Sequence, residues 1–133
     1  MSRKIVNPPE LARPIGFAHG VVAGPFVYLG GQTALDGNGK IVPGGIVEQF
    51  ERAFGNVLTT LRAAGGEPSD LVDVTIYLTD VADYQAHGAQ IGAAWRELAG
   101  TEYPAMAGIG IVSLWQPEAL IEIQAVAHIG DRE

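Results

Sequence analysis

The chain has 133 residues, a length typical of one domain, with 17% charged residues and a net charge of −7. Its eight Lys and Arg stand against fifteen Asp and Glu, which argues against binding to nucleic acid or to anionic membranes. The absence of cysteine excludes disulfides, thiolate nucleophiles and Cys-ligated zinc. Because no signal peptide or membrane span is recognisable, we expect a cytoplasmic protein with a single domain over residues 1–133.

The first half of the chain predicts a hairpin followed by a helix. We expect an irregular Pro-rich arm over residues 1–14, with a short strand at 3–6, and then strands at 16–23 and 26–30 joined by a Gly-Pro turn. Between Val47 and Leu61, apolar residues recur at steps of three and four, which predicts an amphipathic helix that ends at Gly65-Gly66.

The second half predicts a strand at 71–79, a helix at 83–99, and strands at 105–113 and 119–128. The last strand alternates, so Glu122 lies on the face opposite Ile121 and Ile123. This order of elements predicts a two-layer α/β domain (α+β), in which two helices pack on one face of a mixed sheet.

The other face of this sheet is also expected to be partly apolar. Residues 26–29 are apolar without a break, whereas a solvated face would interrupt such a run with polar residues. Since no element remains to cover this face, we expect a second subunit to do so, although the sequence leaves the number of subunits open.

Several segments resemble the Rid (YjgF) reactive-intermediate deaminase family, also labelled endoribonuclease L-PSP-like. They occur in the family's order over nearly the whole chain, at residues 14–17, 27–32, 56–66, 74–80, 103–105 and 119–127. The resemblance implies a chorismate-mutase-like fold and a homotrimer with clefts between subunits. It also implies hydrolysis of enamines and imines to 2-oxo acids and ammonia, without a metal or organic cofactor. The acidic charge does not support the ribonuclease label.

The resemblance also assigns candidate site residues. Glu122 matches a glutamate thought to position or activate water, although a strand glutamate can equally face solvent or hold an interface hydrogen bond. Met106 stands where deaminating members have an arginine that pairs with the substrate carboxylate, and a thioether cannot replace that pairing. Phe17, Gly30 and Gly108 match the family's tyrosine, serine and cysteine. These departures predict a more apolar, roomier pocket and argue against the usual amino-acid-derived substrate.

Four further residues are placed in the binding site. Gly31 follows Gly30 in the matched segment, and Trp115 lies in a loop where it can wall a pocket or simply pack. His19 is a candidate base or donor in a strand that borders the cleft, or an edge-strand polar residue. His87 lies near the position of a family asparagine, matched by about Gly88, or serves as a core or interface residue.

Two functions compete on these residues. One is an imine or enamine hydrolase with water positioned by Glu122, and the other is a non-catalytic trimer that binds a small ligand. Arg13 and Arg96 are the candidates to replace the missing arginine, and nothing in the spacing selects either. No metal is expected, because the histidine spacings typical of metal sites are absent.

Overall fold

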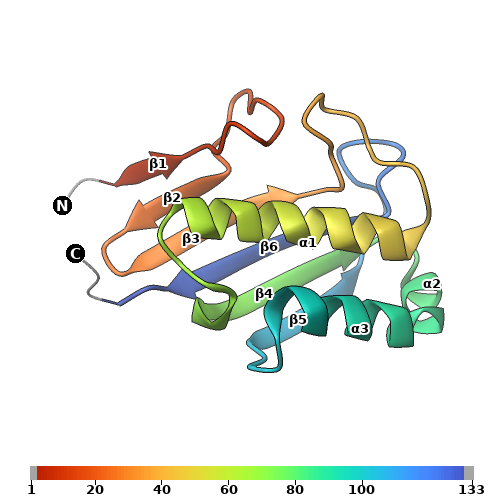
Figure 1. Cartoon of the computed structure of the whole chain (residues 1–133). Coiled ribbons are helices and arrows are strands. Elements are labelled where there is room, and N and C mark those ends of the chain that lie inside the picture. Colours follow the sequence, from red (N-terminus) through yellow and green to blue (C-terminus); the bar gives the residue numbers. More distant parts are fainter. Residues whose placement is uncertain (1–2, 131–133) are drawn as a thin grey trace.

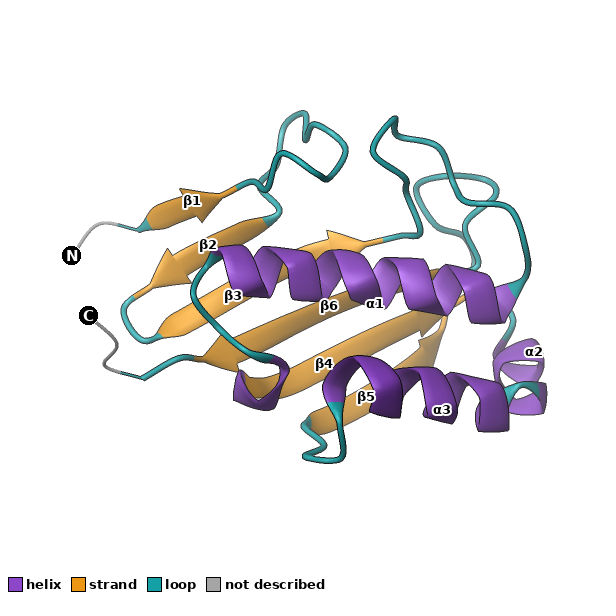
Figure 2. Ribbon diagram, viewed as in Figure 1, coloured by secondary structure: helices purple, strands orange, loops and turns teal. Residues whose placement is uncertain are grey.

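The computed structural model describes residues 3–130. Its centre is a six-stranded sheet in the order β1-β2-β3-β6-β4-β5, in which only the β4–β5 pair is parallel among the described strands. The helices all lie on one face of this sheet (Figures 1 and 2). The strands are β1 (Lys4–Val6), β2 (Gly20–Ala23), β3 (Phe26–Gln32), β4 (Leu71–Leu78), β5 (Ala105–Gly110) and β6 (Ile121–His128). The helices are α1 (Ile46–Ala63), the short 3₁₀ turn η1 (Pro68–Asp70), α2 (Val81–Ala86) and α3 (Gly88–Ala99). The expected two-layer α+β architecture with a mixed sheet is confirmed.

The long helix α1 carries the apolar stripe that its sequence predicted. Phe50, Phe54 and Leu61 are completely buried against the sheet. At the start of the helix, the Glu48 carboxylate accepts a hydrogen bond from the Gly45 backbone amide at 2.9 Å, as in a capping box. The chain leaves the helix through Gly65, which adopts a positive φ of 94°, a conformation that glycine tolerates best.

The second predicted helix is divided in two. Instead of one helix over 83–99, α2 ends at Ala86, His87 has non-helical backbone angles, and α3 begins at Gly88. Glycine is a weak helix former, and the His87 ring bonds back to the Asp83 carbonyl at 2.9 Å. His87 therefore lies at a helix break, partly exposed, and does not belong to the core of the protomer.

Several predicted strands are shorter in the structure. Of the expected strand 16–23, only Gly20–Ala23 pairs, because Gly16 turns with a φ of 81° and the His19 amide bonds to the Asn7 side chain. Strand β5 ends at Gly110, and strand β6 begins only at Ile121. The loop between them is therefore longer than predicted. This longer loop carries Trp115.

The two faces of the sheet differ in cover. On β6, Ile121, Ile123, Ala125 and Ala127 are buried beneath the helices, whereas Glu122, Gln124, Val126 and His128 face the other way. This alternation is the predicted one. On the uncovered face, Tyr28 remains 51% exposed and Phe26 and Ile109 are also exposed, so large apolar groups lie in the open layer.

Candidate functional site

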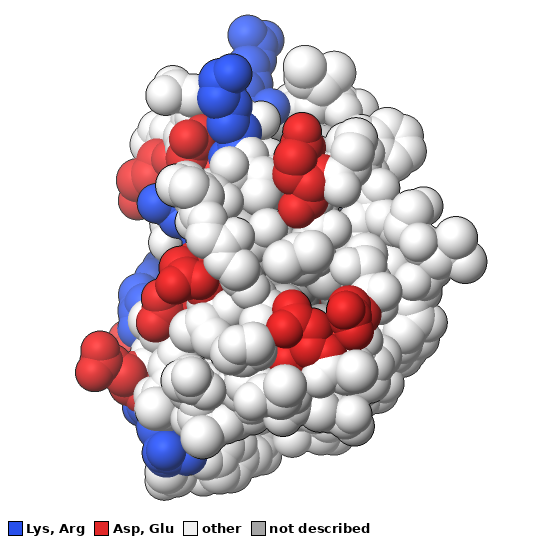
Figure 3. All heavy atoms as spheres, turned by 90° about the vertical axis from the view of Figure 1, so that its right-hand side faces the viewer, with Lys and Arg blue, Asp and Glu red and all other residues white. Residues whose placement is uncertain are grey.

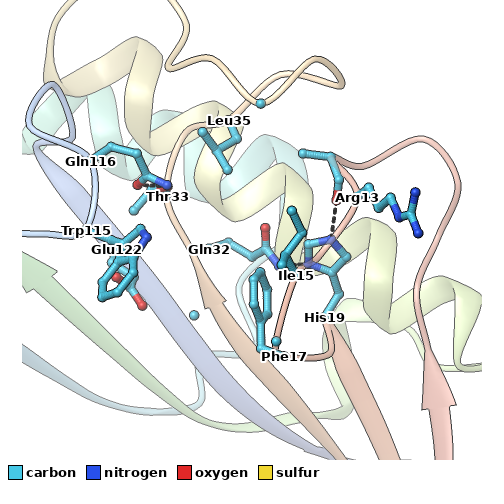
Figure 4. A pocket seen from close by; sticks show the side chains of 14 residues that line it. Arg13, Ile15, Phe17, His19, Gln32, Thr33, Leu35, Trp115, Gln116 and Glu122 are labelled. Carbon is cyan, nitrogen blue, oxygen red and sulfur yellow. Dashed lines mark hydrogen bonds between the residues drawn. The ribbon is translucent and has the colours of Figure 1, made fainter.

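A cavity of about 590 Å³ opens where β3 and β6 meet the loops at one end of the sheet. Its volume lies within the range typical of small-molecule sites. Four segments contribute to it, at residues 12–19, 31–39, 115–116 and 122. The lining residues are Ala12, Arg13, Ile15, Gly16, Phe17, His19, Gly31, Gln32, Thr33, Leu35, Gly39, Trp115, Gln116 and Glu122 (Figure 4).

Glu122 is the only carboxylate among these lining residues. It lies on the uncovered face of β6, opposite Tyr77 on β4, and is partly buried. Burial raises the pKa of its carboxyl above the ordinary 4.5, because removal from water disfavours the charged form. The neighbouring Gly31 makes this placement possible, since a Cβ atom at that position would collide with the Glu122 carboxylate. A carboxyl whose pKa is raised in a cavity is a candidate for proton transfer.

His19 is buried and both its ring nitrogens are engaged. Its Nε2–H donates to the Ala12 carbonyl at 2.7 Å, and its Nδ1 accepts from the Gln32 side-chain amide at 2.8 Å. A carbonyl oxygen can only accept, so the bond to Ala12 places a proton on Nε2. With both nitrogens occupied, His19 holds the wall of the cavity, and this geometry favours the structural alternative over a base.

The remaining walls of the cavity are largely apolar. In Figure 4, Trp115 stands with Glu122 on one side, and Phe17 and Ile15 stand with His19 on the other. Five of the nine predicted site residues line the cavity, namely Glu122, Phe17, His19, Gly31 and Trp115.

Met106 and Gly108 lie elsewhere in the protomer. The register pairs Met106 with Val74, which is buried beneath the helices, whereas the Glu122 partner Tyr77 pairs with Ile109. Residues paired across neighbouring strands share a face, so Met106 and Gly108 belong to the face opposite Glu122. A site that unites them with Glu122 would need residues from a second subunit.

Gly30 and His87 also lie outside the cavity lining. The Gly30 amide donates to the His19 carbonyl at 2.8 Å, and a Cβ atom there would approach the Ala18 carbonyl to 2.9 Å. Gly30 thus permits close backbone packing. His87 lines a separate hollow of about 350 Å³ beside Glu48 and Asp83 at the start of α1.

Sequence reasoning missed the polar side chains between the two walls. Gln32 orients His19, and the Thr33 hydroxyl donates to the Gln116 side-chain oxygen at 2.8 Å. Gln32 and Thr33 directly follow Gly30-Gly31 of the matched family segment, and this position was the sequence signal that could have placed them in the site. Gln116 is tied to Thr33 across 83 positions, a contact that no local pattern indicates.

The charged surroundings are sparse. Arg13 lines the cavity, whereas Arg96 on α3 does not; Figure 4 shows the Arg13 guanidinium directed away from Glu122. On the face shown in Figure 3, Lys and Arg lie along one margin, and acidic and uncharged side chains occupy the rest.

Within residues 3–130, no three His, Asp or Glu side chains are grouped to hold a metal ion, and no helix there is long and apolar enough to cross a membrane.

Many solved protein structures share this two-layer fold with its mixed sheet. The family described as Endoribonuclease L-PSP matches residues 10–129, and the chain belongs to this family, as the resemblance predicted. A RutC family protein of Pyrococcus abyssi is 31% identical over 130 residues, which are 96% of this chain and 98% of the relative.

Two further relatives carry more specific names. The 2-iminobutanoate/2-iminopropanoate deaminase of Capra hircus is 28% identical and covers 96% of this chain and 91% of its own length. The crystal structure of E. coli TdcF with bound serine is 26% identical, with a TM-score of 0.84 and coverage of 94% of this chain and 98% of its own. The family thus includes proteins named as imine deaminases.

Proposed function

We propose that this protein is a small-molecule hydrolase that deaminates an imine or enamine, with water positioned by Glu122. The observation that carries the proposal is the partly buried Glu122 carboxyl, with a raised pKa, in a cavity of about 590 Å³. The names of relatives such as the Capra hircus deaminase support the same reaction class.

The reaction requires only water and one proton-transfer group. Water attacks the imine carbon while the Glu122 carboxylate takes a proton from the water and passes it to the imine nitrogen, so that the C=N bond becomes the C–N single bond of a neutral carbinolamine. Glu122 then takes the hydroxyl proton of the carbinolamine and delivers it to the amine nitrogen as the C–N bond breaks, so that the C=O bond forms and ammonia leaves. The carboxyl returns to its starting state, and one imine and one water give one carbonyl compound and one ammonia. No metal or organic cofactor enters this balance.

We further propose that the protein works as a homotrimer of chorismate-mutase-like fold, with the site completed between subunits. Two observations support association. Phe26, Tyr28 and Ile109 expose apolar surface on the uncovered face of the sheet. In addition, Met106 and Gly108 lie on the face opposite Glu122, so they can reach a cleft with Glu122 only across a subunit boundary.

The reaction can be tested with 2-aminoacrylate and 2-iminobutanoate generated in situ. We expect release of 2-oxo acid faster than spontaneous hydrolysis, and its loss in Glu122→Gln with the assembly unchanged. A parallel Met106→Arg variant tests whether the site needs an arginine to bind the substrate carboxylate. If only this variant accelerates 2-oxo acid release, the wild-type site serves a ligand that lacks that carboxylate. Activity that survives Glu122→Gln removes this residue from the mechanism.

The alternative is a trimer that binds a small ligand without turnover. It is favoured by methionine at position 106, because a thioether cannot pair with the carboxylate of an amino-acid-derived substrate. Saturable binding without product from wild type and from Met106→Arg would establish this alternative.

A further inference from the structure

Three large apolar side chains at the mouth of the Glu122 cavity are exposed. Trp115 is 91% exposed, Ile15 85% and Phe17 58%, and all three line the cavity. Aromatic side chains usually dominate the buried surface of cores and interfaces. Two exposed aromatic side chains and Ile15 therefore surround the cavity that Glu122 lines, which indicates a surface that a ligand covers.

The loop that carries Trp115 is held in place although its side chain is in solvent. The Thr33 hydroxyl bonds to the Gln116 side chain at 2.8 Å. Gln49 of α1 then binds the loop twice: its amide nitrogen donates to the Glu118 carbonyl at 3.1 Å, and its amide oxygen accepts from the Leu120 amide at 2.8 Å. The loop that carries Trp115 is therefore anchored to Thr33, which directly follows β3, and to α1.

The opposite wall is held as firmly. The Phe17 ring meets the His19 ring edge-on, with centroids 5.6 Å apart and an interplanar angle of 86°. His19 is itself fixed by Ala12 and Gln32. The Phe17 ring and the loop that carries Trp115 are thus positioned before a ligand arrives, which lowers the entropy that binding must overcome.

We propose that Trp115 and Phe17 form a specificity subsite for a flat, aromatic group of the ligand, placed beside Glu122. The proposal rests on the proposed function, because it assumes that the ligand bound in this cavity is the substrate of the reaction. Rings stack readily on aromatic faces, and the apolar walls favour an aromatic side chain over a methyl group. The substrate class is therefore an imine or enamine that bears an aryl group, and Trp115 and Phe17 are binding residues that select it.

Binding can be measured without turnover, using 3-phenylpropanoate, its neutral amide, and propanoate as the short control. Trp115 is almost fully exposed, whereas Trp95 is buried beside Phe54, so a ligand at the subsite should change the emission of Trp115. We expect a saturable change with both aryl compounds and none with propanoate. Calorimetry should show binding of the aryl compounds that is at least about tenfold weaker in Trp115→Ala and largely restored in Trp115→Phe.

The matched control is Val112→Ala in the same loop, because Val112 is fully exposed and does not line the cavity. It should bind like wild type. Equal binding of propanoate and 3-phenylpropanoate, or equal losses in Trp115→Ala and Val112→Ala, would overturn the subsite. Aryl binding that persists in Glu122→Gln while no imine is hydrolysed by wild type would support the subsite and refute the proposed reaction, so the two failures are distinguishable.

Discussion

The Glu122 carboxylate occupies the space that a side chain on Gly31 would need. This relationship joins β6 to the end of β3 and sets the position of the catalytic candidate. Gly31→Ala should therefore displace the carboxylate and lower kcat/KM for imine hydrolysis by about 100-fold, with little loss of fold as judged by circular dichroism. Gly55→Ala, which meets no atom within 4 Å, is the control. Unchanged activity in Gly31→Ala would mean that the position of Glu122 is not critical.

The raised pKa of Glu122 predicts a pH dependence of stability. Its pKa in the folded state lies above the ordinary 4.5, so the folded state holds the proton more tightly than the unfolded state. The free energy of unfolding should fall as pH rises from about 4.5 through the folded-state pKa. Glu122→Gln should remove this fall and be the more stable protein at neutral pH. Urea titrations across this range measure the effect, and parallel curves for the two proteins would contradict it.

The same carboxyl predicts a pH dependence of rate. If its ionised form accepts the proton of water, kcat/KM should rise with pH up to the raised pKa and then level off. A midpoint at or below the ordinary carboxyl value would show that another group controls the rate.

His19→Ala should destabilise the protein by about 2–4 kcal/mol, because it leaves the Ala12 carbonyl and the buried Gln32 amide without their partner and creates a cavity. The change should also loosen Phe17 and so raise KM more than it lowers kcat. His87→Ala, at the partly exposed helix break, should change stability by only roughly 0.5 kcal/mol. Chemical denaturation compares them, and equal effects would show that the His19 network is unimportant.

The uncovered face of the sheet predicts how assembly can be broken. Tyr28→Lys places a charge among apolar groups of this face and should convert the proposed trimer to monomers, with folded secondary structure retained. Light scattering after size exclusion gives the mass, and Val112→Lys in the exposed loop is the control. A wild-type monomer, or a Tyr28→Lys trimer, would show that this face is not the interface.

Gly55 offers a stabilising change within α1. Its substitution by Ala should raise the free energy of unfolding by about 1 kcal/mol, since glycine is a poor helix former and space is open around it. Gly65→Ala should destabilise instead, because its φ of 94° disfavours any side chain. Thermal denaturation of both variants tests the pair.

The sequence by itself determined the layers of this protein and the face on which Glu122 lies. Side chains on a strand alternate with a period of two, and helical stripes recur at three and four. Both patterns are local, so the buried faces of α1 and β6 followed from residue order alone. The matched segments indicated the family for the same reason, since each is a short run.

Only the tertiary structure decided which candidates meet. Met106 and Glu122 were assigned to one cleft between subunits, and the pairing of Met106 with Val74 shows that within one protomer they lie on opposite faces of the sheet. The bonds of His19 to Ala12 and Gln32, and of Thr33 to Gln116, depend on loop paths and strand register. These are long-range contacts, whose partners are selected by the packing of the whole chain, and no local periodicity encodes them.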